Sequence, residues 1–122
     1  MEQEKWDKDL RYKIRVRIYK HDLAFGPGVA ELMEYIDETG SLSEACRKME
    51  MAYSKGWRIL KRSEDDFGFP LTQGTRGGKN GGKMLLTKEG KDLLLRYRKF
   101  EQAVQQSANK LFQKYMLEEN NK

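Results

Sequence analysis

The chain has 122 residues, of which 35% are charged and 38% hydrophobic, so it has material for one domain with a modest core. This composition argues against an enzyme built around a deep pocket. The formal net charge is +5, and the stretch from Tyr53 to Lys88 holds eight Lys and Arg residues against three acidic ones. Clustered cations are typical of proteins that bind phosphates, although a mildly basic balance also serves solubility alone.

Several kinds of chemistry lack the residues that they need. His21 is the only histidine and Cys46 the only cysteine, which excludes an intrachain disulfide, a multi-histidine metal site and a histidine-based triad. We therefore expect no enzyme activity, no metal and no cofactor. No signal peptide begins the chain and no stretch approaches the length of a membrane span, so we expect a cytoplasmic protein without membrane contact.

The N-terminal part is predicted to hold a strand and a helix. Residues 12–20 alternate between Ile14, Val16 and Ile18 on one side and cations on the other, which predicts a half-buried strand. Its cationic side is interpreted either as a DNA neighbour or, by preference, as a solvated edge protected from pairing. Apolar residues at helical spacing then predict a helix over 28–38, which Gly40 ends in a left-handed conformation.

The next stretch predicts two short helices joined by a tight turn. Ser41-Leu42-Ser43-Glu44 is a capping box, in which a serine hydroxyl accepts from the first amides and Glu44 reaches back. The helix that follows covers about 42–49, with Cys46 as a small core residue.

The second of these helices covers about 53–65 and presents cations. Gly56, Trp57 and Leu60 fall on its inner face, where Gly56 lets the two helices approach. We expect Trp57 to fill the space beside the hairpin, with stacking on a base as the alternative. The opposite face carries the polar and basic residues Ser54, Lys55, Arg58, Lys61 and Arg62.

A Gly-rich basic segment and a long helix complete the chain. Strands near 71–75 and 83–86 flank the segment and predict a hairpin, and Thr87 caps a helix from Lys88 to about residue 117. This helix has residues at heptad spacing, and its second half extends beyond the core. We expect it to pair with a second copy of the chain, against the alternative that it packs on its own domain. The heptad residues are Leu93, Tyr97, Phe100, Val104, Ser107 and Leu111.

Four segments are characteristic in combination: residues 25–28 (Phe-Gly-Pro-Gly), 36–45 (with Gly-Ser-Leu-Ser), 51–57 (with Tyr-Ser-Lys-Gly-Trp) and 77–82 (Gly-Gly-Lys-Asn-Gly-Gly). Together they resemble the N-terminal DNA-binding domain of the molybdate-responsive ModE regulators over about residues 12–105. The resemblance implies a winged helix-turn-helix, mainly α with a small β wing, in a dimeric prokaryotic transcriptional regulator. LysR-type regulators begin with similar domains.

Three differences from ModE proteins bear on function. The chain ends soon after the matched helix, so we expect no oxyanion-binding domain and no molybdate sensing. Glu50 stands where the tight turn usually has glycine, which costs about 1 kcal/mol in a left-handed conformation. Ala52 replaces the usual hydroxyl cap of the recognition helix, again at a cost of about 1 kcal/mol.

These patterns predict specific binding of duplex DNA by a homodimer. The recognition helix enters the major groove, where Arg58 matches the guanine edge, and the wing holds flanking phosphates. The expected DNA-binding residues are Ser41, Ser43, Tyr53, Ser54, Lys55, Arg58, Lys61, Arg62, Arg76, Lys79, Asn80 and Lys83. The expected dimerisation residues are Tyr97, Phe100, Val104, Leu111, Phe112 and Tyr115.

The expected domain organisation is a flexible N-terminus over 1–11, the winged helix-turn-helix over 12–90, a dimerisation helix over 91–118 and a tail over 119–122. One rival interpretation is a protein-interaction module with only non-specific affinity for DNA, which docks to a protein partner through the last helix. A second is a metal- or oxyanion-responsive sensor, which the scarcity of histidine and cysteine disfavours.

Overall fold

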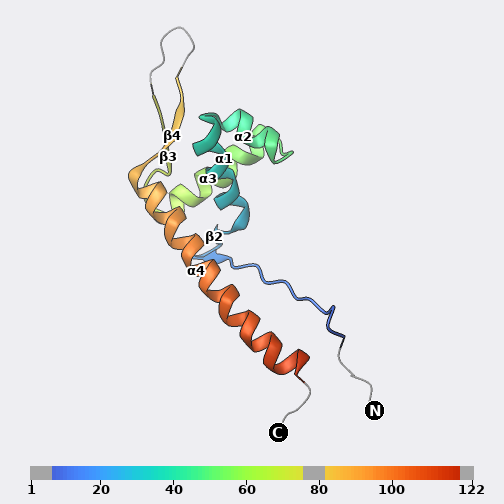
Figure 1. Cartoon of the computed structure of the whole chain (residues 1–122). Coiled ribbons are helices and arrows are strands. Elements are labelled where there is room, and N and C mark those ends of the chain that lie inside the picture. Colours follow the sequence, from blue (N-terminus) through green and yellow to red (C-terminus); the bar gives the residue numbers. More distant parts are fainter. Residues whose placement is uncertain (1–6, 76–81, 119–122) are drawn as a thin grey trace, which may run out of the picture. The chain divides into compact units, whose positions relative to one another are not determined.

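The computed structural model describes residues 7–75 and 82–118 (Figure 1). Contacts divide the chain into two units, Arg15–Arg98 and the terminal segments Met1–Ile14 with Lys99–Lys122. The elements are β1 (Ile18–Tyr19), β2 (Leu23–Phe25), α1 (Pro27–Thr39), α2 (Leu42–Lys48), α3 (Tyr53–Phe67), β3 (Thr72–Gly74), β4 (Met84–Leu86), α4 (Lys88–Phe112) and the π-helical turn η1 (Gln113–Leu117). This order confirms a winged helix-turn-helix, mainly α, that continues into a long C-terminal helix.

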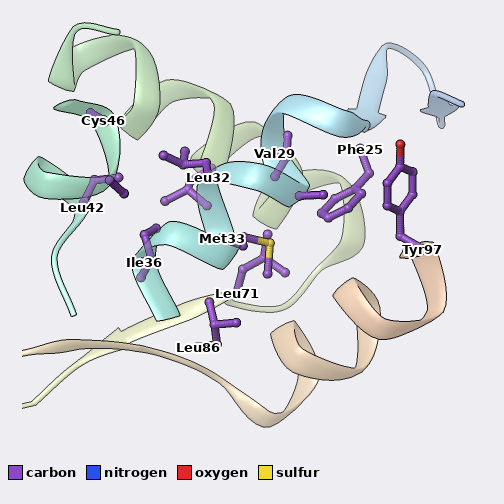
Figure 2. Packing of buried hydrophobic residues seen from close by; sticks show 13 residues of the cluster. Phe25, Val29, Leu32, Met33, Ile36, Leu42, Cys46, Leu71, Leu86 and Tyr97 are labelled. Atoms are coloured by element: carbon purple, nitrogen blue, oxygen red, sulfur yellow. The ribbon is translucent and has the colours of Figure 1, made fainter. Parts of the chain in front are cut away.

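The core of the Arg15–Arg98 unit lies between the first three helices and the start of α4. Figure 1 shows α1, α2 and α3 gathered beside the β3–β4 hairpin. The apolar stripe of α1 is fully buried at Leu32, Met33 and Ile36, as its helical spacing predicts. Figure 2 shows Phe25 beside Tyr97 at one end of the core, where their ring centroids lie 5.0 Å apart. Burial of each such side chain stabilises the fold by about 1.5–3 kcal/mol.

The junction of α1 and α2 confirms one half of the capping box and corrects the other. Gly40 ends α1 with φ 74°, and Ser41 Oγ accepts a hydrogen bond from the Glu44 amide at 3.0 Å. Glu44 does not reach back, because its carboxylate accepts from Arg47 one turn later. The Ser41 amide donates instead to Thr39 Oγ1 at 3.2 Å, so α1 supplies the missing half of the cap.

The turn between α2 and α3 keeps the geometry that glycine usually provides. Glu50 has φ 55°, and the Met51 amide donates to the Cys46 carbonyl at 3.0 Å. Ala52 stands at the start of α3 and provides no side-chain cap. α3 continues two residues beyond the predicted end, because Gly68 at φ 83° is the first residue that adopts a left-handed cap.

The strand predicted over residues 12–20 is mostly wrong. Only Ile18 and Tyr19 form β1, which pairs antiparallel with the short β2 through an irregular register. The sequence did not indicate β2, which has three residues. Such a short strand can pair only with the last residues of the alternating stretch. The Val16 carbonyl accepts instead from the Tyr97 hydroxyl at 2.6 Å.

The hairpin and the start of α4 follow the prediction. β3 and β4 pair antiparallel with Gln73 opposite Leu85, and the Thr75 amide donates to the Lys83 carbonyl at 2.7 Å. Thr87 caps α4, because its hydroxyl accepts from the Gly90 amide at 2.8 Å. Within residues 7–75 and 82–118, no helix is long and apolar enough to cross a membrane.

Candidate nucleic-acid interface

The outward face of α3 is polar and cationic. Gly56, Leu60 and Ser63 are buried, and the opposite side of the helix exposes Ser54, Arg58 and Lys61. Lys61 Nζ lies 3.9 Å from Asp65 Oδ1, an exposed pair that contributes little to stability. Arg58 forms no ion pair with any residue in the described part of the chain. Its guanidinium is therefore available to an external acceptor.

Two aromatic side chains stand exposed on the same helix. Tyr53 is 55% exposed and Trp57 is 51% exposed, so the prediction that Trp57 lies on the inner face and fills the space beside the hairpin is wrong. One residue along a helix is a rotation of about 100°, which carries Trp57 away from the buried position of Gly56. Ser63 occupies the inner face instead, and its hydroxyl donates to the Ala24 carbonyl at 2.5 Å. Trp57 thus belongs to the solvent-facing surface beside Arg58.

The beginning of α2 and the base of the hairpin meet at a shallow hollow of about 350 Å³. Four predicted DNA-binding residues line it: Ser41, Ser43, Tyr53 and Lys83. The Met84 amide donates to the Gly40 carbonyl at 2.9 Å, which fixes the hairpin against the start of α2. The predicted residues Arg76, Lys79 and Asn80 lie outside the described residues.

The structure separates two of the six predicted DNA-binding residues of α3 from the others. Lys55 and Arg62 lie on a lateral side of the helix, around a pocket that they share with Arg15 and Arg17. Sequence reasoning did not assign a site to Arg15 or Arg17. The signal that was available is the uninterrupted alternation of cations in residues 11–17, which the preferred interpretation assigned to a solvated edge.

The second half of α4 exposes apolar residues. Phe100 and Leu111 are more than half exposed, and with Val104 and Ile14 they line an open apolar groove of about 440 Å³. Phe112 is partly covered by its own chain, because the Tyr12 ring packs against it at 4.7 Å between centroids.

Tyr97 is a correction to the predicted dimerisation surface. It is 1% exposed, and its ring packs in the core of the Arg15–Arg98 unit, where its hydroxyl contacts the Val16 carbonyl (Figure 2). The inner half of the heptad pattern therefore serves the domain core, so Tyr97 is not available to a partner helix. Tyr115, at 70% exposed, remains available.

Comparison with known proteins agrees with this geometry. Residues 30–91, about half of the chain, match the bacterial regulatory helix-turn-helix proteins of the lysR family. The chain belongs to this family. The matched stretch extends from α1 to the first turn of α4, so it contains the whole helix-turn-helix and the hairpin. The proteins of this family are helix-turn-helix regulators, which agrees with the arrangement of α2, the tight turn and α3 in this lysR-family domain.

Two curated relatives confirm the resemblance of this lysR-family domain to ModE. The molybdenum-pterin-binding protein MopB of Rhodobacter capsulatus is 32% identical over 73 residues, which are 60% of this chain and 27% of MopB. The transcriptional regulator ModE of Haemophilus influenzae is 31% identical over 75 residues, which are 62% of this chain and 29% of ModE. The chain thus spans less than a third of each relative.

The lysR-family domain holds its one thiol in the core. Cys46 is 2% exposed, and burial raises the pKa of its thiol, an effect that a backbone hydrogen bond with Gly56 partly offsets. A buried neutral thiol is a weak nucleophile. Among the described residues, no group of three or more His, Cys, Asp or Glu side chains has the arrangement of a metal site.

Proposed function

We propose that the chain binds specific duplex DNA sites as a dimeric transcriptional regulator. The observation that carries the proposal is the outward face of α3, where Ser54, Arg58 and Lys61 lie opposite the buried face. A helix of this kind fits the major groove, which admits one helix and presents a distinct pattern for each base pair. The hairpin, called the wing below, stands beside α3 and contacts flanking phosphates.

The proposed contacts divide into base reading and phosphate binding. Arg58 reads guanine through its two parallel donors, and the exposed Trp57 ring beside it contacts an apolar thymine methyl group. Lys83, Ser43 and the hydroxyl of Tyr53 lie around one hollow and bind a phosphate there. The remaining proposed DNA contacts are Ser41, Ser54, Lys55, Lys61, Arg62, Arg76, Lys79 and Asn80. About four to six phosphates per protomer give a steep salt dependence.

The second half of α4 is the proposed dimer surface. Phe100, Val104 and Leu111 line one side of the helix, and a groove of exposed apolar residues is typical of a covered interface. Leu111→Glu places a charge in this surface and is expected to convert a dimer to a monomer in size-exclusion chromatography with light scattering. The exposed Leu95→Glu, which lies outside the groove, is the matched control.

The decisive experiment is selection from a pool of genomic fragments at near-physiological salt, followed by sequencing of the bound fraction. One inverted-repeat motif is the expected result, because a two-fold dimer reads two half-sites. On the selected motif, Arg58→Ala should cost about 1–3 kcal/mol and relax the preference at one base pair. Lys83→Ala should weaken all sequences equally. Arg96→Ala is the control, since Arg96 pairs with Asp92 on α4.

The alternative function is a protein-interaction module. The exposed apolar residues Phe100 and Leu111 in the second half of α4 favour it, because they offer a docking surface to an unlike partner. Recovery of random fragments, with affinity that collapses as salt rises, would reject the proposed specific regulator in favour of this module.

A further inference from the structure

The pocket that Lys55 and Arg62 share with Arg15 and Arg17 lies on the lateral side of α3. It has a volume of about 310 Å³ and is formed by α3, the beginning of α1 and residues 15–17. Its apolar wall includes Leu23, Val29 and Ile59, which are buried or half-buried. This size is at the lower end of the range of small-ligand sites, about 300–1,000 Å³, and an apolar wall with a few polar groups is their usual composition.

The charge around this pocket is of one sign. Four exposed cations line it, Arg15, Arg17, Lys55 and Arg62, and no acidic residue does. None of the four forms an ion pair with a residue in the described ranges. Like charges that face one space repel each other, so an anion that enters the pocket relieves the repulsion and gains charge-assisted hydrogen bonds.

The end of a helix adds to this potential. α1 begins at the pocket, with Gly26 as its N-cap and Pro27 as its first residue. No side chain caps these first amides, so the positive end of the helix dipole remains uncompensated beside the cations.

The composition of the wall decides the chemical class of the ligand. A phosphate of the DNA backbone or an inorganic anion uses the cations but makes no contact with the apolar wall, where Leu23 and Ile59 are only half-buried. We propose that the pocket binds a small organic anion, in which a carboxylate or phosphate head is joined to an apolar body about the size of a phenyl ring. The head contacts the arginines and Lys55, and the body covers the apolar wall.

This pocket gives the protein a route to regulation, and that consequence rests on the proposed function. Lys55 and Arg62 are also among the proposed DNA contacts, so a bound organic anion occupies side chains that DNA requires. Ligand and DNA therefore compete, and each lowers the apparent affinity of the other by the same factor.

The test compares three probes by isothermal titration of the full chain. Phenyl phosphate has the charged head and the apolar body, inorganic phosphate has the head alone, and phenol has the body alone. Phenyl phosphate is expected to bind at least about tenfold more tightly than either of the others. Saturating phenyl phosphate should also weaken binding of the selected DNA motif.

Two variants locate the binding of the probe. The double variant Arg15→Gln with Arg17→Gln changes exposed residues and should lower the affinity for phenyl phosphate about tenfold. Gly28→Leu should block it, because Gly28 lines the pocket and a Cβ there meets no atom within 4 Å. The control is Arg58→Gln with Lys61→Gln on the outward face of α3, which should leave phenyl phosphate binding unchanged and weaken DNA binding.

The outcomes separate this proposal from the proposed function. Equal binding of phenyl phosphate and inorganic phosphate, or no binding of either, overturns the ligand pocket. If the Arg15 and Arg17 changes weaken DNA binding while no probe binds, the four cations are a DNA-phosphate contact; the ligand pocket fails and the DNA-binding function stands. If phenyl phosphate binds as expected but no DNA motif is recovered, only the proposed function fails.

Discussion

The backbone of Gly56 lies directly against the sulfur of Cys46, so that a Cβ added at Gly56 would lie 2.2 Å from Sγ. Gly56 is in α3 and Cys46 is in α2, and this contact sets how closely the two helices pack. The sulfur is buried, and the close packing of a protein core resists its displacement.

Gly56→Ala is therefore expected to lower the free energy of unfolding by about 1–3 kcal/mol through overpacking, measured by urea denaturation. Gly28→Ala is the matched control. It lies in α1 with no atom within 4 Å of the added Cβ, and it should raise stability by about 0.5–1 kcal/mol. Equal effects of the two substitutions would contradict the close approach.

Burial of the Cys46 thiol makes stability depend on pH in the alkaline range. Burial raises the pKa of the Cys46 thiol above its ordinary value of 9.0. The unfolded chain then loses this proton at a lower pH than the folded chain, so the contribution is complete below pH 9.0 and is lost as pH rises through the raised value. As pH rises above 9.0, wild type should lose more unfolding free energy than Cys46→Ala. Parallel pH profiles of the two proteins would refute this.

Glu50 carries a backbone strain that glycine would remove. At φ 55° its Cβ is crowded, so Glu50→Gly should raise stability by about 0.5–1 kcal/mol in thermal unfolding. Glu31→Gly, at an exposed position inside α1, is the control and should lower stability by about 1 kcal/mol. A loss of stability at both positions would mean that the Glu50 side chain makes a stabilising contact.

Because Trp57 is exposed, its substitution is expected to affect DNA binding more than the free energy of unfolding. Trp57→Ala should change the unfolding free energy by less than about 1 kcal/mol, whereas Leu60→Ala, at a position 5% exposed, should cost about 2–5 kcal/mol. Under the proposed function, Trp57→Ala still weakens binding to the selected motif. If Trp57→Ala lowered the free energy of unfolding as much as Leu60→Ala, Trp57 would have to be a buried core residue.

The burial of Tyr97 predicts a stability effect without an effect on assembly. Tyr97→Phe keeps the ring but leaves the Val16 carbonyl without its 2.6 Å donor, which should cost about 1 kcal/mol. The oligomeric state should not change, in contrast to Leu111→Glu. Under the proposed dimerisation, dissociation of Tyr97→Phe into monomers would show that this residue acts at the dimer surface.

Much of the fold follows from local signals in the sequence. The apolar stripe of α1, the left-handed Gly40 and the hydroxyl cap of Thr87 each depend on residues within one or two turns, so they were predicted correctly. The close approach of α2 and α3 followed from the small size of Gly56.

The incorrect predictions concern features that depend on contacts with residues distant in the sequence. The strand over 12–20 needed a partner strand, and only the short β2 was present. Trp57 lies at the border of the buried arc of α3. Ser63 lies on the inner face instead, because its hydroxyl donates to the Ala24 carbonyl, 39 residues upstream. The lateral grouping of Lys55 and Arg62 with Arg15 and Arg17 likewise depends on where the chain before α1 crosses α3, which helical spacing does not encode.

The buried Thr87 gives the wing a mechanical role. Its hydroxyl donates to the Pro70 carbonyl at 2.7 Å and its amide donates to the Leu71 carbonyl at 2.9 Å, while Gly90 packs against that same carbonyl. These contacts therefore join both ends of the hairpin directly to the first turn of α4. A force that bends the wing is therefore delivered to α4 as a torque on that turn, rather than being absorbed in a loop.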